Sequence, residues 1–410
     1  MNILFATIAF PENMEQRNIY TDLMEELRDR GHSVHVITSS ERRFGKETRL
    51  EEEKGIEVLR VQTFNLKGTK NPIEKGIGTL IIDRQFRKAI VKFWPLKTFG
   101  MVLYSTPPIT LDGVVRYIKK RDRAKSYLLL KDIFPQNAVD IGLIKKGSIL
   151  HKYFSTREKK LYMLSDYIGC MSQANVDYLK DKASYIPDER IEVCPNSIRP
   201  KELFLSEKNK KAIRARYNIP GDAVAFIYGG NLGKPQGIRF LEKALDANKN
   251  RGNAYFLIVG SGTEYERLRK TVDQLEAGNI ALYPSLPKKD YDFLLQACDV
   301  GLIFLDPNFT IPNFPSRLLA YMEGSKPVIA ATDTSTDIGK VITEGGFGFW
   351  CESGDLDTFN FHIDTLCKSR KLRQEMGLKA RQYLLEHYTV SKAADIILKH
   401  FFEGESNVQG

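Results

Sequence analysis

The chain has 410 residues, which is too long for one ordinary hydrophobic core, because single cores stop growing at roughly 250–300 residues. It is 42% hydrophobic and 27% charged, a globular composition that excludes a disordered, collagen-like or disulfide-scaffold chain. The net charge is +10, and residues 1–197 carry +8 of it, with 33 Lys and Arg against 25 Asp and Glu. This excess predicts an anionic partner for the first half of the chain.

Membrane-spanning and secreted proteins are not favoured by the sequence. No apolar run approaches the ~20 residues that cross a bilayer, and the N-terminus lacks the basic region and cleavage site of a signal peptide. The five cysteines are odd in number and widely spaced, so we expect reduced core thiols. His32 and His35 do not combine with other ligand types at metal-binding spacing and are expected to be structural. We therefore predict a cytoplasmic protein without a metal site.

Short apolar runs alternate with amphipathic segments along the first half of the chain. Strands are predicted near 2–8, 33–38, 56–61, 101–105, 126–131, 167–171 and 191–194. Helices are predicted near 19–30, 79–94, 110–121, 149–164 and 172–180. A highly charged stretch from Lys201 to Lys211 follows, and we place a domain boundary before it, at residue 197.

The second half repeats the same alternation. Strands are predicted near 223–229, 255–260, 280–283, 300–305, 327–331 and 347–350. Helices are predicted near 206–217, 237–248, 263–276, 288–297, 315–324, 336–343 and 355–368, followed by two more at about 370–387 and 390–402. The polar residues 404–410 are expected to form a flexible tail.

Repeated strand–helix units predict parallel strands joined by right-handed crossovers. The predicted fold class is therefore α/β, with two tandem Rossmann-like, doubly wound domains over residues 1–197 and 198–387. In such sheets ligands lie outside the carboxyl ends of the strands. An interdomain cleft is thus the expected site.

Two segments of the second half have residues suited to a phosphate. In Gly229–Gly237, glycines would let backbone amides approach a phosphate, and Lys234 would add a positive charge. Arg317 follows Pro315 at a predicted helix start, where a guanidinium suits a pyrophosphate. A tight turn with an exposed lysine, and a capped helix with Arg317 in a salt bridge, are the structural alternatives. A third glycine turn, Val259–Gly262, lies on the same sheet edge.

The order of these motifs resembles the retaining glycosyltransferases of the GT-B fold, namely the glycosyl transferases group 1 (family four), and within them a bacterial surface-polysaccharide branch. The matching segments extend over nearly the whole chain. They are Arg30–His32, Lys131–Gln136, Pro195–Ser197, Gly230–Gly237, Val259–Gly262 and Pro315–Val328.

The resemblance implies that the second domain binds a nucleotide-sugar, with UDP-sugar favoured, as a substrate and without a cofactor. A hexosyl or N-acetylhexosaminyl group would be transferred with retention, independently of metal, to a polyprenyl-diphosphate-linked or glycan acceptor held by the first domain. The product would belong to capsule, O-antigen or exopolysaccharide synthesis. The last helix, about 388–403, would return to the first domain. The implied donor-binding residues are Asn231, Lys234, Gly260, Ser285, Leu286, Ser316 and Arg317.

Several positions depart from the pattern of that family. Pro312 and Ala320 stand where the family has two glutamates, and Glu323 lies near the same helix face as Ala320. The segment Pro11–Arg17 contains no glycine where the family has a glycine-rich loop. These departures favour an alternative function, a catalytically degenerate subunit that binds nucleotide or glycan and supports an active partner.

Lys131 and Asp132 are the predicted catalytic residues. Lys131 stands where the family commonly has a histidine, and Asp132 follows it at the carboxyl end of a strand. A carboxylate in this place could orient the acceptor or donor sugar. The structural alternative for Asp132 is a helix cap, or a salt bridge to Lys131 or another cation.

The segment 67–97 is strongly basic, with eight Lys and Arg against two acids, and its part 79–94 separates an apolar face from a basic face. We predict that this basic face attracts anionic lipid and a polyprenyl-diphosphate acceptor, which places the protein peripherally on the inner face of the membrane. An ordinary domain helix with a solvated basic face is the alternative. The predicted face consists of Arg84, Arg87, Lys88, Lys92 and Trp94.

Two further functions are less favoured. A nucleotide-sugar epimerase of the same architecture needs acid–base groups that the histidines do not supply. Nucleic-acid binding would fit a basic chain, but the basic clusters match no standard motif. The sequence leaves open whether the protein forms a homo- or hetero-oligomer.

Overall fold

The computed structural model describes residues 1–66 and 71–402. The chain divides into two compact units, Met1–Arg199 with Val390–Gly410, and Pro200–Thr389. The predicted boundaries at 197 and 387 each lie two residues from these divisions. The predicted tail, 404–410, lies outside the described residues. Within the described ranges, no helix is both long enough and apolar enough to cross a membrane.

The first unit is built on an eight-stranded sheet of order β3-β4-β2-β1-β5-β6-β7-β8. Every predicted strand is present. β3 was not predicted, and its pairing with β4 is antiparallel whereas the other pairs are parallel. The strands are β1 (Asn2–Thr7), β2 (Ser33–Glu41), β3 (Arg49–Glu53), β4 (Ile56–Thr63), β5 (Met101–Ser105), β6 (Lys125–Leu130), β7 (Tyr167–Cys170) and β8 (Ile191–Val193).

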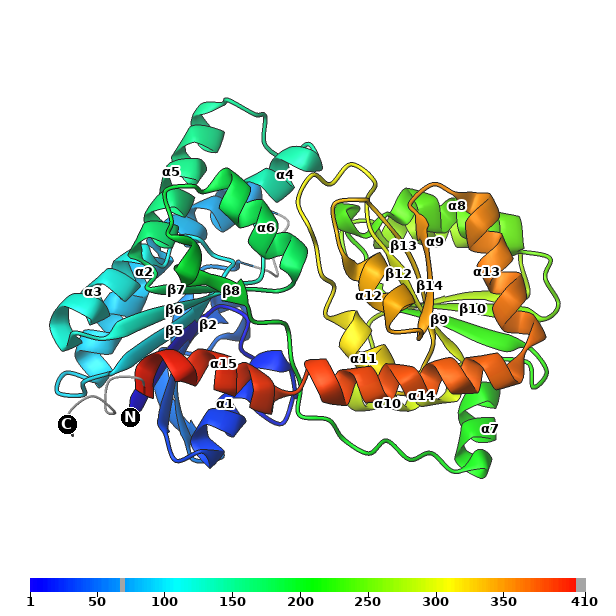
Figure 1. Ribbon diagram of the computed structural model, residues 1–410, viewed down its shortest axis with the longest axis horizontal. Coiled ribbons are helices and arrows are strands. Elements are labelled where there is room, and N and C mark those ends of the chain that lie inside the picture. The colour runs from blue at the N-terminus through cyan, green and yellow to red at the C-terminus, as the bar shows by residue number, and fades with distance from the viewer. Residues whose placement is uncertain (67–70, 403–410) are drawn as a thin grey trace. The chain divides into compact units, whose positions relative to one another are not determined.

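Helices cover this sheet, and the last helix of the chain is one of them (Figure 1). They are α1 (Ile19–Asp29), α2 (Pro72–Phe93), α3 (Asp112–Asp122), α4 (Gln136–Asp140), α5 (Ile149–Leu164), α6 (Gln173–Lys182) and α15 (Val390–Phe402). α15 packs beside α1, where Arg30 Nη1 lies 2.6 Å from Asp395 Oδ1 and Val390 N donates to Ile198 O at 3.0 Å. These contacts tie the end of the chain to the first unit.

The second unit has a fully parallel six-stranded sheet of order β11-β10-β9-β12-β13-β14. Its strands are β9 (Val224–Asn231), β10 (Ala254–Ser261), β11 (Ile280–Tyr283), β12 (Val300–Phe304), β13 (Val328–Thr332) and β14 (Gly348–Glu352). Its helices are α7 (Glu207–Arg216), α8 (Ile238–Asn248), α9 (Tyr265–Leu275), α10 (Lys288–Ala297), α11 (Arg317–Glu323), α12 (Ile338–Glu344), α13 (Leu356–Lys368) and α14 (Arg370–His387).

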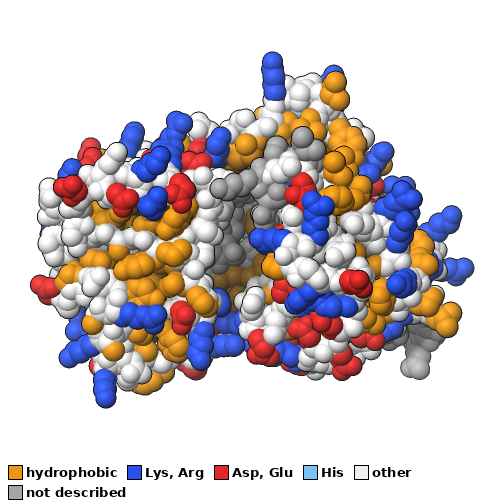
Figure 2. Space-filling view, turned by 180° about the vertical axis from the view of Figure 1, so that it is seen from behind, with side chains coloured by type: hydrophobic (Ala, Val, Ile, Leu, Met, Phe, Trp, Pro, Cys, Tyr) orange, Lys and Arg blue, Asp and Glu red, His pale blue; other side chains and the backbone are white. Residues whose placement is uncertain are grey.

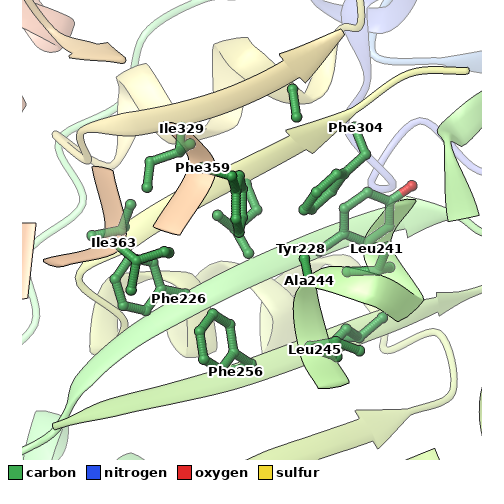
Figure 3. Close-up of a cluster of buried hydrophobic side chains, with 14 of the residues drawn as sticks. Phe226, Tyr228, Leu241, Ala244, Leu245, Phe256, Phe304, Ile329, Phe359 and Ile363 are labelled. Carbon is green, nitrogen blue, oxygen red and sulfur yellow. The ribbon is translucent and has the colours of Figure 1, made fainter. Parts of the chain in front are cut away.

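An aromatic cluster fills the core between this sheet and helices α8 and α13 (Figure 3). Phe226 of β9 stacks on Phe256 of β10 at 5.2 Å between ring centroids, and Phe304 of β12 meets Phe359 of α13 at 5.4 Å. Both faces of the central strands are buried, which is why their sequences are continuous apolar runs instead of alternating ones. Because all strands are parallel, their carboxyl ends share one edge, where the candidate site lies.

Candidate functional site

Glycines bring the ends of β9 and β10 unusually close together. Gly230 has φ +127°, a conformation that favours glycine, and a Cβ added to Gly260 would lie 2.0 Å from Gly230 O. A Cβ on Gly262 would lie 2.3 Å from Leu232 O. Only glycine fits at Gly260 and Gly262, because neighbouring backbone fills the space that a side chain would need, and the strand ends at this edge therefore present bare backbone.

Arg317, at the start of α11, lies against this edge. Its guanidinium donates from Nη2 to Gln236 Oε1 and stands over the Tyr228 ring, with Cζ 4.2 Å from the ring centroid. Nη1 is buried and has no hydrogen-bond partner among the described residues, and Arg317 has no carboxylate within 4.0 Å in that part of the chain. The predicted salt-bridge alternative is therefore wrong, and Arg317 retains an uncompensated charge and an unused donor beside the glycines.

A tyrosine framework holds this arrangement in place. Tyr321 of α11 donates to Leu302 O at 3.0 Å, and its hydroxyl accepts from Gly229 N at 3.3 Å. Tyr291 of α10 occupies the space where a Cβ on Gly229 would fall, 1.9 Å from its Oη. These bonds fix α11, and with it Arg317, against β9 and β12. Sequence reasoning missed the roles of these tyrosines because aromatic residues in such segments are typical of a core.

The other predicted donor residues lie on the loops at the same edge. Lys234 is exposed directly after β9, and within the described ranges no carboxylate lies within 4.0 Å of it. Ser285, after β11, donates to Ser261 Oγ at 2.9 Å, and Leu286 beside it is half-buried. Ser316 is exposed at the cap of α11 and makes no capping hydrogen bond with its side chain. The edge thus carries a cation and hydroxyl groups in addition to Arg317.

Glu323 does not take the place of the missing glutamates. Its side chain is buried at the far end of α11 from Arg317, and Oε1 accepts a hydrogen bond from Lys201 N at 2.9 Å. Pro312 is buried and offers no acid, and Ala320 offers none either. The carboxyl edge of the second sheet therefore relies on Arg317 and Lys234 without an acidic residue at either family position.

Asp132, directly after β6, belongs to the carboxyl edge of the first sheet. Asn137 Nδ2 donates to Asp132 Oδ1 at 2.5 Å, and Thr106 Oγ1 accepts from Asp132 N at 3.2 Å. Burial raises the pKa of Asp132 to about 6, although Asn137 and the backbone N–H of Ile133 lower it. No ion pair joins Asp132 to Lys131 within the described ranges, so the salt-bridge alternative is wrong.

A second carboxylate, Glu158 of α5, was not predicted. Burial raises its pKa to about 7, and it accepts a hydrogen bond from Tyr162 Oη at 2.9 Å. The charge of Asp132 adds to this rise, so the two acids share one electrostatic environment. Two carboxyl groups with raised pKa values at a sheet edge are typical of a functional site.

Replacing Asp132 with asparagine should change stability in a pH-dependent way. The folded-state pKa of Asp132 lies above the ordinary aspartate value of 3.8. The stabilising contribution of its protonated form is therefore complete below pH 4 and is lost as the pH rises through 6. We expect Asp132→Asn to stabilise the protein by roughly 1–2 kcal/mol more at pH 8 than at pH 4, after allowance for partial exposure. Thermal melts of Asp132→Asn and of the exposed control Asp177→Asn test this. An equal effect of Asp132→Asn at both pH values would contradict it.

The side chain of Lys131 contacts other residues than the side chain of Asp132 does. Its Nζ donates to Cys194 O at 3.4 Å, and Leu129 and Ala393 lie beside it around the same small cavity. Burial lowers the pKa of Lys131. A catalytic role for Lys131 stays a prediction.

A buried arginine holds the segment Pro11–Arg17, which contains no glycine. Arg60 of β4 is fully buried, donates from Nη1 to Pro11 O at 2.7 Å, and pairs with Glu53 and with Glu51 Oε2, the latter at 2.8 Å. Glu53 in turn accepts from Met14 N at 2.7 Å. β3 carries both glutamates and therefore links this segment, through Arg60 and Met14 N, to the edge of the sheet.

The predicted basic face of α2 needs one correction. Arg84, Arg87, Lys88 and Lys92 are exposed, as the helical pattern predicts. Trp94, however, is buried, and its Nε1 donates to Glu57 Oε2 at 2.9 Å. It also packs against His35 at 5.6 Å between ring centroids. Trp94 is therefore a core residue and cannot contact a membrane.

Within residues 1–66 and 71–402 there is no group of three or more His, Cys, Asp or Glu that could hold a metal ion. His35, which was expected to be structural, donates a hydrogen bond from Nδ1 to Glu57 Oε2 at 2.9 Å.

Comparisons with known sequences agree with the architecture. Residues 209–383 match the model of the family described as glycosyl transferases group 1. WbjE of Pseudomonas aeruginosa, named as a glycosyltransferase, is 28% identical over 272 residues, which cover 65% of this chain and 66% of WbjE, just under two thirds of it. WcaI of Escherichia coli K12, named as a colanic acid biosynthesis glycosyl transferase, is 21% identical over 83% of this chain and 86% of its own length.

Solved structures show the same fold. Sucrose-phosphate synthase from Thermosynechococcus elongatus superposes with a TM-score of 0.76 at 16% identity over 98% of both chains. HepE of Anabaena, solved in complex with UDP-glucose, gives a TM-score of 0.69 at 15% identity over 98% of this chain and 99% of its own. With its two α/β units the protein therefore has the GT-B fold of these glycosyltransferase structures, and its residues 209–383 carry the match to the glycosyl transferases group 1.

Proposed function

We propose that the protein transfers a hexosyl or N-acetylhexosaminyl group from a UDP-sugar to a lipid-linked or glycan acceptor in bacterial surface-polysaccharide synthesis. The observation that carries this proposal is Arg317, whose buried Nη1 lacks a partner among the described residues beside the glycine-lined strand ends. The name of WcaI supports the polysaccharide context, and the UDP-glucose complex of HepE supports the donor.

The chemistry follows from charge at the diphosphate. In transfer with retention, the bond between the anomeric carbon and the diphosphate oxygen breaks, the acceptor oxygen attacks from the same face, and the acceptor proton passes to the leaving diphosphate. Negative charge therefore grows on the phosphates, and preorganised cations there lower the barrier. In the proposed mechanism, the side chains of Arg317 and Lys234 supply two such cations, so the transfer step does not need a metal ion. Asp132, ionised above about pH 6, would accept a hydrogen bond from a sugar hydroxyl.

A second candidate function is a subunit that binds nucleotide without turning it over. The observation that favours it is the absence of an acid at Pro312 and Ala320, together with the engagement of Glu323 by Lys201 N. Such a subunit would hold the diphosphate through Arg317 but lack the group that positions the donor ribose. Both candidates require donor binding and differ in turnover.

A nucleotide screen separates these candidates. We expect one nucleotide among UDP, GDP, ADP, TDP and CMP to raise the melting temperature, with UDP favoured, because a ligand that binds only the folded state stabilises it. Release of UDP from UDP-sugars should then be detectable with a membrane fraction as the acceptor source. Binding without any release would favour the non-catalytic subunit. The absence of a response to every nucleotide would contradict both.

We also propose that the first unit attaches peripherally to an anionic membrane on the cytoplasmic side, at the turn that precedes α5. Ile149 is 89% exposed and Leu143 is 63% exposed, which is unusual for large aliphatic side chains. Lys145 and Lys146 lie between them in the sequence and Lys152 follows, and all three lysines are exposed, so this segment combines exposed apolar and basic side chains. Figure 2 shows hydrophobic and basic side chains together at the top of this unit. The exposed arginines and lysines of α2 would add long-range attraction.

Liposome sedimentation tests this attachment. Wild-type protein should sediment with vesicles that contain phosphatidylglycerol and much less with neutral phosphatidylcholine vesicles. Ile149→Ser with Leu143→Ser should reduce sedimentation at least fivefold, since both side chains would otherwise enter the acyl boundary. Leu378→Ser, at an exposed leucine of α14, is the matched control and should have no effect. Equal binding to neutral and anionic vesicles would contradict the proposal.

A further inference from the structure

A second concave site lies at the opposite edge of the second sheet from the glycines. Its floor is formed where strands begin, at Val224 of β9, Asp299 before β12 and Pro327 before β13. Helix α7 and the start of α14 form its walls, and both are seen beside this end of the unit in Figure 1. The cavity has a volume of about 660 Å³, enough for a small phosphorylated molecule. It shares no lining residue with the carboxyl edge that carries Arg317.

Positive charge dominates the lining of this cavity. Three acids, Glu207, Asp222 and Asp299, face six cations, which leaves a net charge of +3. The six cations are Lys210, Lys211, Arg214, Lys326, Arg370 and Arg373.

The carboxylate of Asp299 is already paired with neighbouring groups. Its carboxylate lies 3.0 Å from Arg214 Nη1 and 3.8 Å from Lys210 Nζ, and it accepts the backbone N–H of Ala225 at 2.9 Å. In the described part of the chain, no ion pair within 4.0 Å joins the other cations of the lining to an acid. These four uncompensated cations are Lys211, Lys326, Arg370 and Arg373.

The inner wall of the cavity contains two largely buried cations, Lys326 and Arg214. Lys326 follows α11 and donates from Nζ to Gln296 O at 3.0 Å. Burial, and next the positive charge of Lys210, lower the pKa of Lys326 to about 8. Arg214, which is 8% exposed, has a buried Nε without a hydrogen-bond partner among the described residues. An anion in the cavity would relieve the repulsion and supply acceptors.

We propose that this cavity is a binding site for a small anion with two or more phosphate groups, separate from the donor site. Guanidinium groups match phosphate oxygens in geometry, and a charge of −3 to −4 on a diphosphate balances the +3 of the lining. The concave shape between two helices and the strand starts suits a compact anion better than an extended polymer. The site does not depend on the proposed transferase activity, since it is formed by different residues at the other edge of the sheet.

Inorganic pyrophosphate is the probe, and Arg317→Gln is the background in which the donor site is weakened. Titration calorimetry at constant ionic strength should find one site per chain in this background. Adding Lys211→Gln and Arg370→Gln, both at exposed cations, should weaken binding at least tenfold. The control pair Arg267→Gln and Arg269→Gln on α9 should leave the affinity within twofold. No binding at millimolar pyrophosphate, or equal binding after the Lys211 and Arg370 substitutions, would overturn the proposal.

A site-resolved measurement accompanies the calorimetry. The rate of acetylation of Lys326 at pH 8, followed by mass spectrometry, should fall at least fivefold when pyrophosphate saturates the site, because a bound anion covers the amine and favours its charged form. Lys249, a partly exposed lysine at the end of α8 that pairs with Asp246, should react at an unchanged rate. Equal slowing of both lysines would indicate a general salt effect and would overturn the proposal.

Discussion

Replacing Arg317 with glutamine should weaken the binding of UDP about 30- to 100-fold. The guanidinium contributes a charge and an unpartnered Nη1 beside Gly230, and loss of charge-assisted hydrogen bonds to a diphosphate costs roughly 2–3 kcal/mol. The glutamine can still approach Gln236 and Tyr228, so the fold around α11 should be retained. Titration calorimetry with UDP measures the affinity, and circular dichroism checks the fold.

Two comparisons sharpen the result for Arg317. Lys234→Gln removes an exposed and flexible charge, so its effect should be smaller, near tenfold. Arg269→Gln, at an exposed arginine of α9 that pairs with Glu266, should change nothing. If Arg317→Gln bound UDP as well as the wild type while Lys234→Gln did not, the diphosphate would lie elsewhere on the edge.

The sequence predicted the framework well because parallel strands buried on both faces produce continuous apolar runs. β3 is the exception. Its sequence, Arg49 to Glu53, has one apolar residue, and it forms a strand because it pairs with β4 and brings Glu51 and Glu53 to the buried Arg60. That stabilisation is tertiary, and no local pattern signals it.

The burial of Trp94 agrees with the helical periodicity of its segment. Trp94 follows Ile90 by four positions, and Ile90 follows Phe86 by four, so the helical repeat puts the indole on the apolar face. Its burial against His35 confirms that geometry. The adjoining basic segment favours an interfacial indole, whereas periodicity alone predicts a core residue.

The partners of the site residues could not be predicted in the same way. Gln236 and Tyr228 reach Arg317 across more than 80 positions of the chain. Glu158 shares an electrostatic environment with Asp132 only because α5 packs near the end of β6. Motif spacing identifies the residue types at the strand ends. It does not identify their neighbours, because these come from segments distant in sequence. Packing of such segments leaves Arg317 Nη1 unpartnered and raises the pKa of Asp132.

Replacing Gly260 with alanine should destabilise the second unit by about 3 kcal/mol and lower its melting temperature by roughly 6–12 °C. The new Cβ would stand 2.0 Å from Gly230 O, and the obstacle is backbone in a neighbouring strand, which cannot turn aside as a flexible side chain can. β9 and β10 would have to separate at their carboxyl ends. Because Gly230 adjoins Arg317, the separation should also weaken UDP binding.

A glycine at the other end of the same strand provides the control. An added Cβ on Gly252, just before β10, would meet nothing within 4 Å, so Gly252→Ala should leave the melting temperature unchanged or raise it slightly. Differential scanning fluorimetry with and without UDP measures both effects. A Gly260→Ala protein as stable as Gly252→Ala would mean that the strand ends can part freely. The close approach of β9 and β10 would then not be what shapes the donor edge.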